Sequence, residues 1–143
     1  MTLCDMSGNF LDSLVLPADM DERVCALALL LQVKKQAWSQ NLHVVFADSG
    51  FAGEGFQRQI QTQTGLQLTI VKRNPDAVGF QVLPKRWLIE QVFGCWGRNR
   101  RLSRDYEQQP RHSRATLQVA SIHRFLNSIQ PKPQLPPFKY KSL

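Results

Sequence analysis

Residues 84–102 read PKRWLIEQVFGCWGRNRRL, and they carry more information about fold and function than the rest of the chain. The leading proline suits the first turn of a helix, and the apolar residues that follow predict a helix over about residues 84–99. One carboxylate, Glu90, lies in this apolar and cationic run. Five arginines gather around it: Arg86, Arg98, Arg100, Arg101 and Arg104. An acidic residue among basic ones suggests a site that holds a metal ion while the surrounding charge binds a phosphate backbone.

The predicted helix is apolar on nearly every side. Glu90 shares its side with Trp87, Phe93 and two glycines, and the opposite side carries Leu88 and Val92. Such a helix is expected to be buried. Because an unpaired buried charge is costly, Glu90 then needs a partner. That partner is either an arginine in a structural salt bridge or a divalent cation shared with other carboxylates.

Outward from this helix, strands and helices alternate along the chain. An Asp-x-x-Gly turn at residues 5–8 separates two strands that would form a hairpin. Asp19 and Glu22 have the spacing of a capping box before the first helix. The predicted strands cover residues 1–5, 9–16, 42–47 and 66–73; the predicted helices cover 20–38, 53–64, 84–99 and 112–129; a loop covers 74–83. The order β-β-α-β-α-β-α-α predicts a mixed α/β domain over residues 1–130.

The end of the chain has two distinct patterns. The helix over 112–129 carries apolar residues on one face: Ala115, Val119, Ile122, Leu126 and Ile129. The last thirteen residues, PKPQLPPFKYKSL, contain four prolines and three lysines. Residues 131–143 are therefore predicted to be a disordered tail.

Composition and charge restrict the possible classes of protein. The 143 residues are 43% hydrophobic, without the run of roughly 20 apolar residues that a membrane span needs, and the start lacks a secretion signal. Three cysteines stand far apart without CxxC spacing. These features predict a cytoplasmic protein with reduced thiols and no membrane partner.

The net charge of +7 is unevenly distributed. Residues 1–84 carry six basic and eight acidic side chains, a net −2, whereas residues 85–143 carry twelve and three, a net +9. This asymmetry indicates a polyanionic partner, with DNA or RNA as the first candidates. The alternative is a solvated basic face without a specific partner.

Two further carboxylates follow predicted strands. Asp48 comes directly after the apolar strand that ends in VVFA, and ligands of α/β sheets collect beyond such strand ends. Asp5 follows the first strand in the same way. A helix cap or turn would also explain Asp48, and the Asp-x-x-Gly turn would explain Asp5.

Four segments together resemble the catalytic domain of DDE-type transposases of bacterial insertion sequences. They are CDMSG, PADMDER, VVFADSGFAG and RWLIEQVFGCWGRNRRLSRDYE, and the resemblance extends over about residues 3–129. It implies an RNase H-like fold in which Asp5, Asp48 and Glu90 are the catalytic metal ligands. Arg86, Arg98, Arg100 and Arg101 become candidates for contacts with DNA phosphates. At least one arginine is expected to bridge instead to Asp105 or Glu107.

The resemblance also implies a chemistry. Three carboxylates would bind Mg²⁺, with two ions expected and Mn²⁺ as a substitute, because these cations prefer oxygen ligands. Such a centre would nick DNA at the end of the mobile element and then transfer the strand to target DNA during transposition.

The sequence departs from the family pattern at its front. The family has a helical domain that binds the element's ends ahead of the catalytic domain, and here the strand that carries Asp5 begins only four residues before it. The expected fold is therefore an RNase H-like mixed sheet with a shortened first strand, N-terminally truncated. The alternative function is a catalytically inactive transposase remnant that binds DNA non-specifically, or that dimerises with itself or with full-length transposase.

Overall fold

The computed structural model describes residues 1–71 and 85–130. The four strands are β1 (Thr2–Cys4), β2 (Phe10–Ser13), β3 (Val44–Ala47) and β4 (Gln67–Ile70). The four α-helices are α1 (Glu22–Lys34), α2 (Glu54–Thr64), α3 (Arg86–Gly97) and α4 (Pro110–Ile129). Short 3₁₀ turns cover Ala37–Asn41, Ser49–Phe51 and Arg100–Leu102. Element type and order follow the sequence prediction, so the α/β class is confirmed. The predicted loop over 74–83, the residue Pro84 and the predicted tail over 131–143 lie outside the described residues.

The strands form two separate pairs. β1 and β2 are antiparallel, with Leu3 opposite Asp12, and β3 and β4 are parallel, with Val45 opposite Leu68. Within the described part of the chain, no ladder joins one pair to the other. The sequence predicts a single RNase H-like sheet. The two strand pairs are compatible with that prediction, but they do not confirm it.

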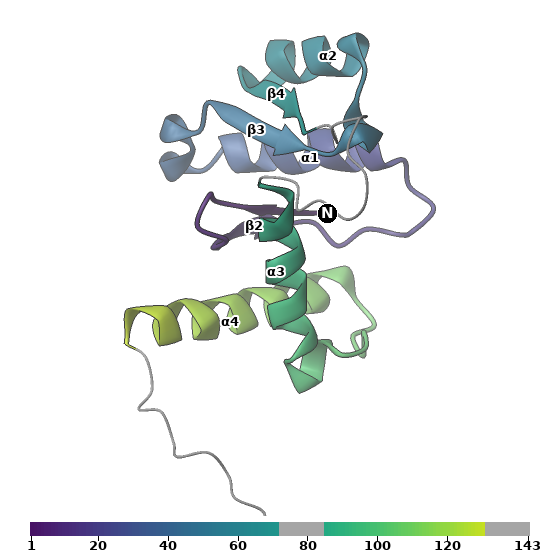
Figure 1. The fold of residues 1–143 in the computed structure, drawn as a ribbon. Coiled ribbons are helices and arrows are strands. Elements are labelled where there is room, and N and C mark those ends of the chain that lie inside the picture. The colour runs from purple at the N-terminus through teal and green to yellow at the C-terminus, as the bar shows by residue number, and fades with distance from the viewer. Residues whose placement is uncertain (72–84, 131–143) are drawn as a thin grey trace, which may run out of the picture.

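Two small cores stabilise the molecule, one around each pair of strands. In the upper half of Figure 1, α1 and α2 pack on β3 and β4 through Leu30, Phe56, Ile60 and Leu66. In the lower half, α3 crosses α4 beneath the β1–β2 hairpin. That second core is built on Val92, Trp96 and Ala120, with Phe10 packed against it.

A buried carboxylate on β2 links the two halves. Asp12 is 5% exposed, and its Oδ1 accepts a hydrogen bond from Arg114 Nη2 of α4 at 2.8 Å. Its Oδ2 accepts one from Gln32 Nε2 of α1 at 2.7 Å. One side chain thus connects β2, α1 and α4, and it fixes the helix on which α3 rests.

Several helix boundaries differ from the predicted ones by one to four residues, and two of these differences have local reasons. Asp21 rather than Asp19 caps α1, because its side chain accepts hydrogen bonds from the backbone N–H groups of Arg23 and Val24. α3 begins at Arg86, since Lys85 before it has a left-handed backbone with φ of 72° that a helix cannot include.

Candidate functional site

Asp5 is held in place by its own turn. It follows β1, and its Oδ1 accepts hydrogen bonds from the backbone N–H groups of Ser7 and Asn9, both at 2.8 Å. Its Oδ2 accepts a third from Asn9 Nδ2 at 2.9 Å. Gly8 completes the turn with φ of 75°, a conformation that favours glycine. The Asp-x-x-Gly turn predicted from the sequence is therefore present, and both carboxylate oxygens take part in it.

The surroundings of Asp5 favour its charged form. Partial burial raises the pKa of this carboxyl, but hydrogen bonds from Asn9 and Ser7 and the positive charge of Arg124 outweigh it, so the pKa lies below its ordinary value. Arg124 comes from α4, and its Nη1 also donates a hydrogen bond to the carbonyl oxygen of Gly8. The carboxylate therefore stays charged to a lower pH than an ordinary aspartate does, while both of its oxygens accept hydrogen bonds from the turn.

Asp48 lies at the end of β3, where the sequence predicts it. Its Oδ1 accepts a hydrogen bond from the backbone N–H of Gly50 at 2.9 Å, and the side chain is exposed. A second arginine ties down the turn that follows. Arg23 Nη2 from α1 donates to the carbonyl oxygens of Gly50 and Ala52, at 3.3 and 2.8 Å. Each strand-end aspartate therefore precedes a turn whose backbone carbonyls are held by an arginine from a helix.

Glu90 lies on the exposed side of α3. Leu88, Val92 and Trp96 form the buried face of this helix, whereas Trp87 and Phe93 are 46% and 51% exposed. The prediction that the helix is buried nearly all round is wrong for the side that carries Glu90. Since Glu90 remains in contact with solvent, its charge does not have the desolvation cost that the sequence suggested.

The three carboxylates, far apart in the sequence, line one pocket. This pocket has a volume of about 430 Å³ and is bounded by β1, α1, β3 and α3. Asp5, Asp48 and Glu90 are its acidic residues, and most of the remaining wall is apolar, including Leu30, Phe46 and Leu88. Lys85 adds a positive charge, with its Nζ 3.4 Å from the centre of the Phe46 ring.

The three carboxylates are suitable ligands for a divalent cation, but in this structure they lie too far apart to bind one ion together. Three carboxylates around one pocket provide the oxygen ligands that Mg²⁺ or Mn²⁺ prefers. Among the residues that the structure describes, however, no three His, Cys, Asp or Glu side chains lie close enough together to hold one ion. Asp5, Asp48 and Glu90 therefore share a pocket without converging on a point.

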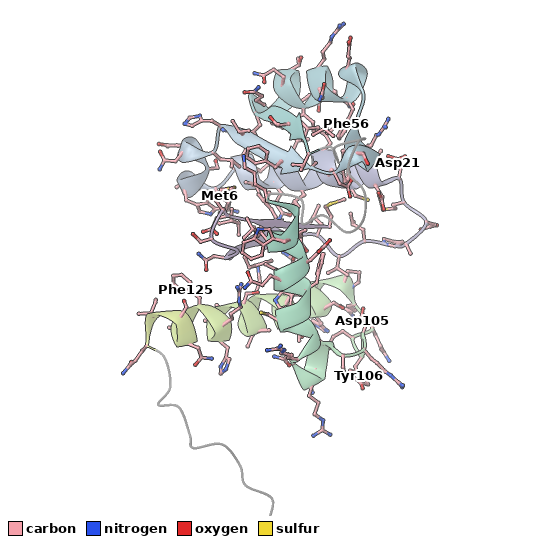
Figure 2. All side chains as sticks on the ribbon, viewed as in Figure 1. Met6, Asp21, Phe56, Asp105, Tyr106 and Phe125 are labelled. Atoms are coloured by element: carbon pink, nitrogen blue, oxygen red, sulfur yellow. The ribbon has the colours of Figure 1, made fainter. Side chains whose placement is uncertain are left out.

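Three of the four predicted DNA-binding arginines lie away from this pocket. Arg98, Arg100 and Arg101 are exposed at the far end of α3 and in the 3₁₀ turn that follows. Arg98 is eight residues beyond Glu90, which is roughly 12 Å along a helix axis. Figure 2 shows Asp105 and Tyr106 at this same lower end of the molecule. Arg86 begins α3, and its side chain lies outside the described residues.

One of these arginines has an acidic neighbour, as expected. Arg101 Nη2 lies 3.8 Å from Glu107 Oε1, and the Arg101 side chain remains 76% exposed. Such an exposed pair contributes little to stability and leaves most of the guanidinium open to solvent. The expectation that at least one arginine bridges to Asp105 or Glu107 is confirmed.

Comparison with models of protein families assigns residues 1–124 to a family described as the transposase DDE domain. The chain belongs to this family. The resemblance inferred from the sequence motifs is thereby confirmed, and a transposase lineage implies DNA as partner. Domains of this family generally use divalent metals. Searches of curated proteins and of solved structures gave no match.

In this transposase DDE domain, two arginines that contact the aspartate turns, Arg23 and Arg124, were not identified from the sequence. Their contacts span 27 to 116 residues, and no local pattern signals them.

None of the described helices is long and apolar enough to span a membrane.

Proposed function

We propose that this chain is a transposase catalytic domain that nicks DNA and transfers the cut strand during transposition of an insertion sequence, with Asp5, Asp48 and Glu90 as its metal ligands. One observation carries the proposal. Three acidic residues from three separate segments line a single pocket, and the resemblance of their sequence motifs to DDE-type transposases implies that they are the catalytic carboxylates. A structural role for each side chain alone would not require all three to line the same pocket.

The protein's own groups prepare this pocket for a cation. The turn around Asp5 keeps its carboxylate ionised, and Arg23 and Arg124 hold the turns that present Asp48 and Asp5. A divalent metal held by these carboxylates would help to deprotonate the attacking water or hydroxyl and would stabilise the negative charge on the leaving oxygen. In the first reaction, water attacks a phosphodiester and leaves a free 3′-hydroxyl and a 5′-phosphate. In the second, that 3′-hydroxyl attacks a target phosphodiester, a new phosphodiester bond forms, and the 3′ oxygen of the target strand leaves as a hydroxyl.

The apolar walls of the pocket give a reason why the carboxylates could approach each other. Leu30, Phe46 and Phe93 line a space of about 430 Å³ that they do not fill. Bringing Asp5 and Asp48 closer to Glu90 would bury apolar surface, at roughly 25 cal/mol for each Å² removed from water. Mutual repulsion of three carboxylates opposes this approach, and a bound cation would remove that repulsion.

The exposed arginines suggest how DNA lies on the domain. Arg98, Arg100 and Arg101 would contact phosphates beside the reacting bond rather than at it, because the end of α3 is roughly 12 Å from Glu90. Phosphate contacts of this kind position a duplex without reading its sequence, and they weaken as salt rises.

The inactive remnant is the second candidate, and a specific observation favours it. The three carboxylates do not converge on one point among the described residues. A chain that cannot bring the three together would bind DNA through its basic second half without cutting it.

Nicking of supercoiled plasmid separates the two candidates. We expect the purified chain to convert supercoiled DNA to open circles with Mg²⁺ or Mn²⁺, and Glu90→Gln to reduce the rate by at least ~10³-fold, because the lost carboxylate would be a metal ligand. Glu54→Gln is the matched control, since Glu54 is an exposed residue on α2 paired with Arg58.

The outcomes are distinct. Cation-dependent nicking that persists in Glu90→Gln would remove Glu90 from the site and end the assignment. If the wild-type chain retards DNA in a gel but never nicks it with either metal, the inactive remnant is the correct description.

A further inference from the structure

The apolar face of α4 points away from the rest of the molecule. Four of the five residues that define this face are more than half exposed: Val119 at 66%, Ile122 at 58%, Leu126 at 59% and Ile129 at 65%. The fifth, Ala115, is exposed as well. Phe125 beside them is 49% exposed and is labelled on α4 in Figure 2. Among the described residues, no element of the domain covers the most hydrophobic side of α4.

The other side of α4 is firmly attached, so the orientation of the helix is defined. Ser121 Oγ accepts a hydrogen bond from Trp96 Nε1 at 2.9 Å, and Arg114 forms the ion pair with buried Asp12. Arg124 donates to the carbonyl oxygen of Gly8, and Ala120 belongs to the lower core. Rotating α4 to bury the apolar face would break all four contacts. The exposed face is therefore a consequence of how the helix is held.

The spacing on this face fits a second helix. Ala115, Val119, Ile122, Leu126 and Ile129 are separated by four, three, four and three residues, which is the a/d pattern of two heptads. We call these five residues the α4 seam. Two heptads alone are too short for a stable free coiled coil. Here the helix is already folded by its contacts with α3 and β2, so association would not have to supply its folding energy.

The seam and Phe125 form one contiguous apolar patch rather than scattered exposed residues. Apolar patches of several hundred Å² often mark interaction sites. A hollow of about 530 Å³ adjoins the seam, lined by Phe10, Trp96, Ile122 and Phe125 among others, and it offers room for side chains of a partner.

The scarcity of charged residues along the seam favours a second copy of this chain as the partner over a charged helix of another protein. Between residues 115 and 130 only His123 and Arg124 are titratable, and Arg124 is engaged with the Asp5 turn. An acidic or basic partner helix would find no complementary charge along the seam. Two copies would bring no strong like charges together there, although the whole chain carries +7. Interfaces between identical chains favour such neutral, self-complementary apolar faces.

We propose that the α4 seam is a dimer interface at which two copies of this chain pair helix to helix. None of the residues of α4 lines the pocket of the three carboxylates. Asp5 and Arg124 do line the hollow beside the seam, so the proposed interface and the proposed metal site adjoin at the Asp5 turn. Such a dimer would place two DDE domains side by side, each with its own carboxylates and its own basic surface on α3.

Sedimentation equilibrium of the purified chain tests the proposal. We expect a concentration-dependent dimer below ~100 µM, and at least ~tenfold weaker association for the double variant Ile122→Ser/Leu126→Ser. Val24→Ser is the matched control, because Val24 is a 56% exposed apolar residue on α1, away from the seam. Circular dichroism establishes that each variant keeps its helices.

Methyl NMR of the wild-type chain on dilution gives a second measurement that needs no variant. The methyl shifts of Val119, Ile122, Leu126 and Ile129 should change together, while those of Val24 stay constant. A wild-type chain that is monomeric at ~100 µM overturns the proposal. So does a double variant that dimerises as tightly as the wild type, or a set of shift changes that avoids α4.

Discussion

At the scale of single residues, two arginines hold the turns that follow the strand-end aspartates. Arg23 reaches from α1 to the carbonyl oxygens of Gly50 and Ala52, and Arg124 reaches from α4 to the carbonyl oxygen of Gly8. The acceptors of these hydrogen bonds are backbone carbonyls, so each arginine would act by fixing the backbone that presents a carboxylate. Arg124 adds a favourable charge beside Asp5. They are positioning residues in the proposed site.

Replacing Arg23 tests this role. Arg23→Ala removes both hydrogen bonds to the turn after Asp48, so we expect amide hydrogen exchange at residues 48–52 to accelerate and stability to fall by about 1 kcal/mol. Arg58→Ala is the control, since the Arg58–Glu54 pair is 79% and 83% exposed and should contribute little. Unchanged exchange at residues 48–52 in Arg23→Ala would show that the turn holds itself.

Local signals in the sequence identified the residues with local roles. The Asp5 turn was predictable because Asp and Gly at the first and last positions satisfy that turn by themselves. Arg23 and Arg124 were not predictable, because their partners are set by how distant elements pack. The environment of Glu90 was predicted wrongly for a related reason: apolar composition indicates burial of the helix but not which side remains open.

At the scale of elements, Asp12 is the junction of the molecule. It joins β2 to α1 through Gln32 and to α4 through Arg114, and both bonds are shorter than 2.9 Å. Because α3 packs against both β1 and α4, the position of Glu90 depends on this junction. An ion pair with one partner this deeply buried becomes costly when only that partner is removed.

Asp12→Ala should therefore destabilise the whole chain by about 3 kcal/mol or more, because it leaves the Arg114 guanidinium partly buried without its carboxylate. Denaturant unfolding followed by circular dichroism measures the change. Asp19→Ala, at an exposed position before α1, should change stability by less than ~0.5 kcal/mol. Equal effects of the two substitutions would show that Asp12 does not have this stabilising role.

Helix and strand positions followed from sequence periodicity, but their partners did not. The 3–4 spacing in α4 identified five residues that share one face, and the structure places that face outward. Periodicity tells which residues lie together on an element and leaves open what covers them. The strands show the same limit, since the sequence predicted four strands in order while their pairing is non-local.

At the scale of the whole molecule, function depends on bringing distant parts together. The two cores stand around separate strand pairs, and the pocket of Asp5, Asp48 and Glu90 lies between them. The basic surface of α3 and the α4 seam both belong to the lower half (Figure 1). In this arrangement, closing the pocket and pairing two chains are separate events, each open to its own measurement.

The most direct test of the central claim, that the three carboxylates act as one metal site, is calorimetric titration with Mn²⁺. The account predicts saturable binding by the wild-type chain that is weakened at least ~tenfold by each of Asp5→Asn, Asp48→Asn and Glu90→Gln, and left unchanged by Glu54→Gln. Binding that is absent, or that survives the loss of any one of the three carboxylates, would contradict it.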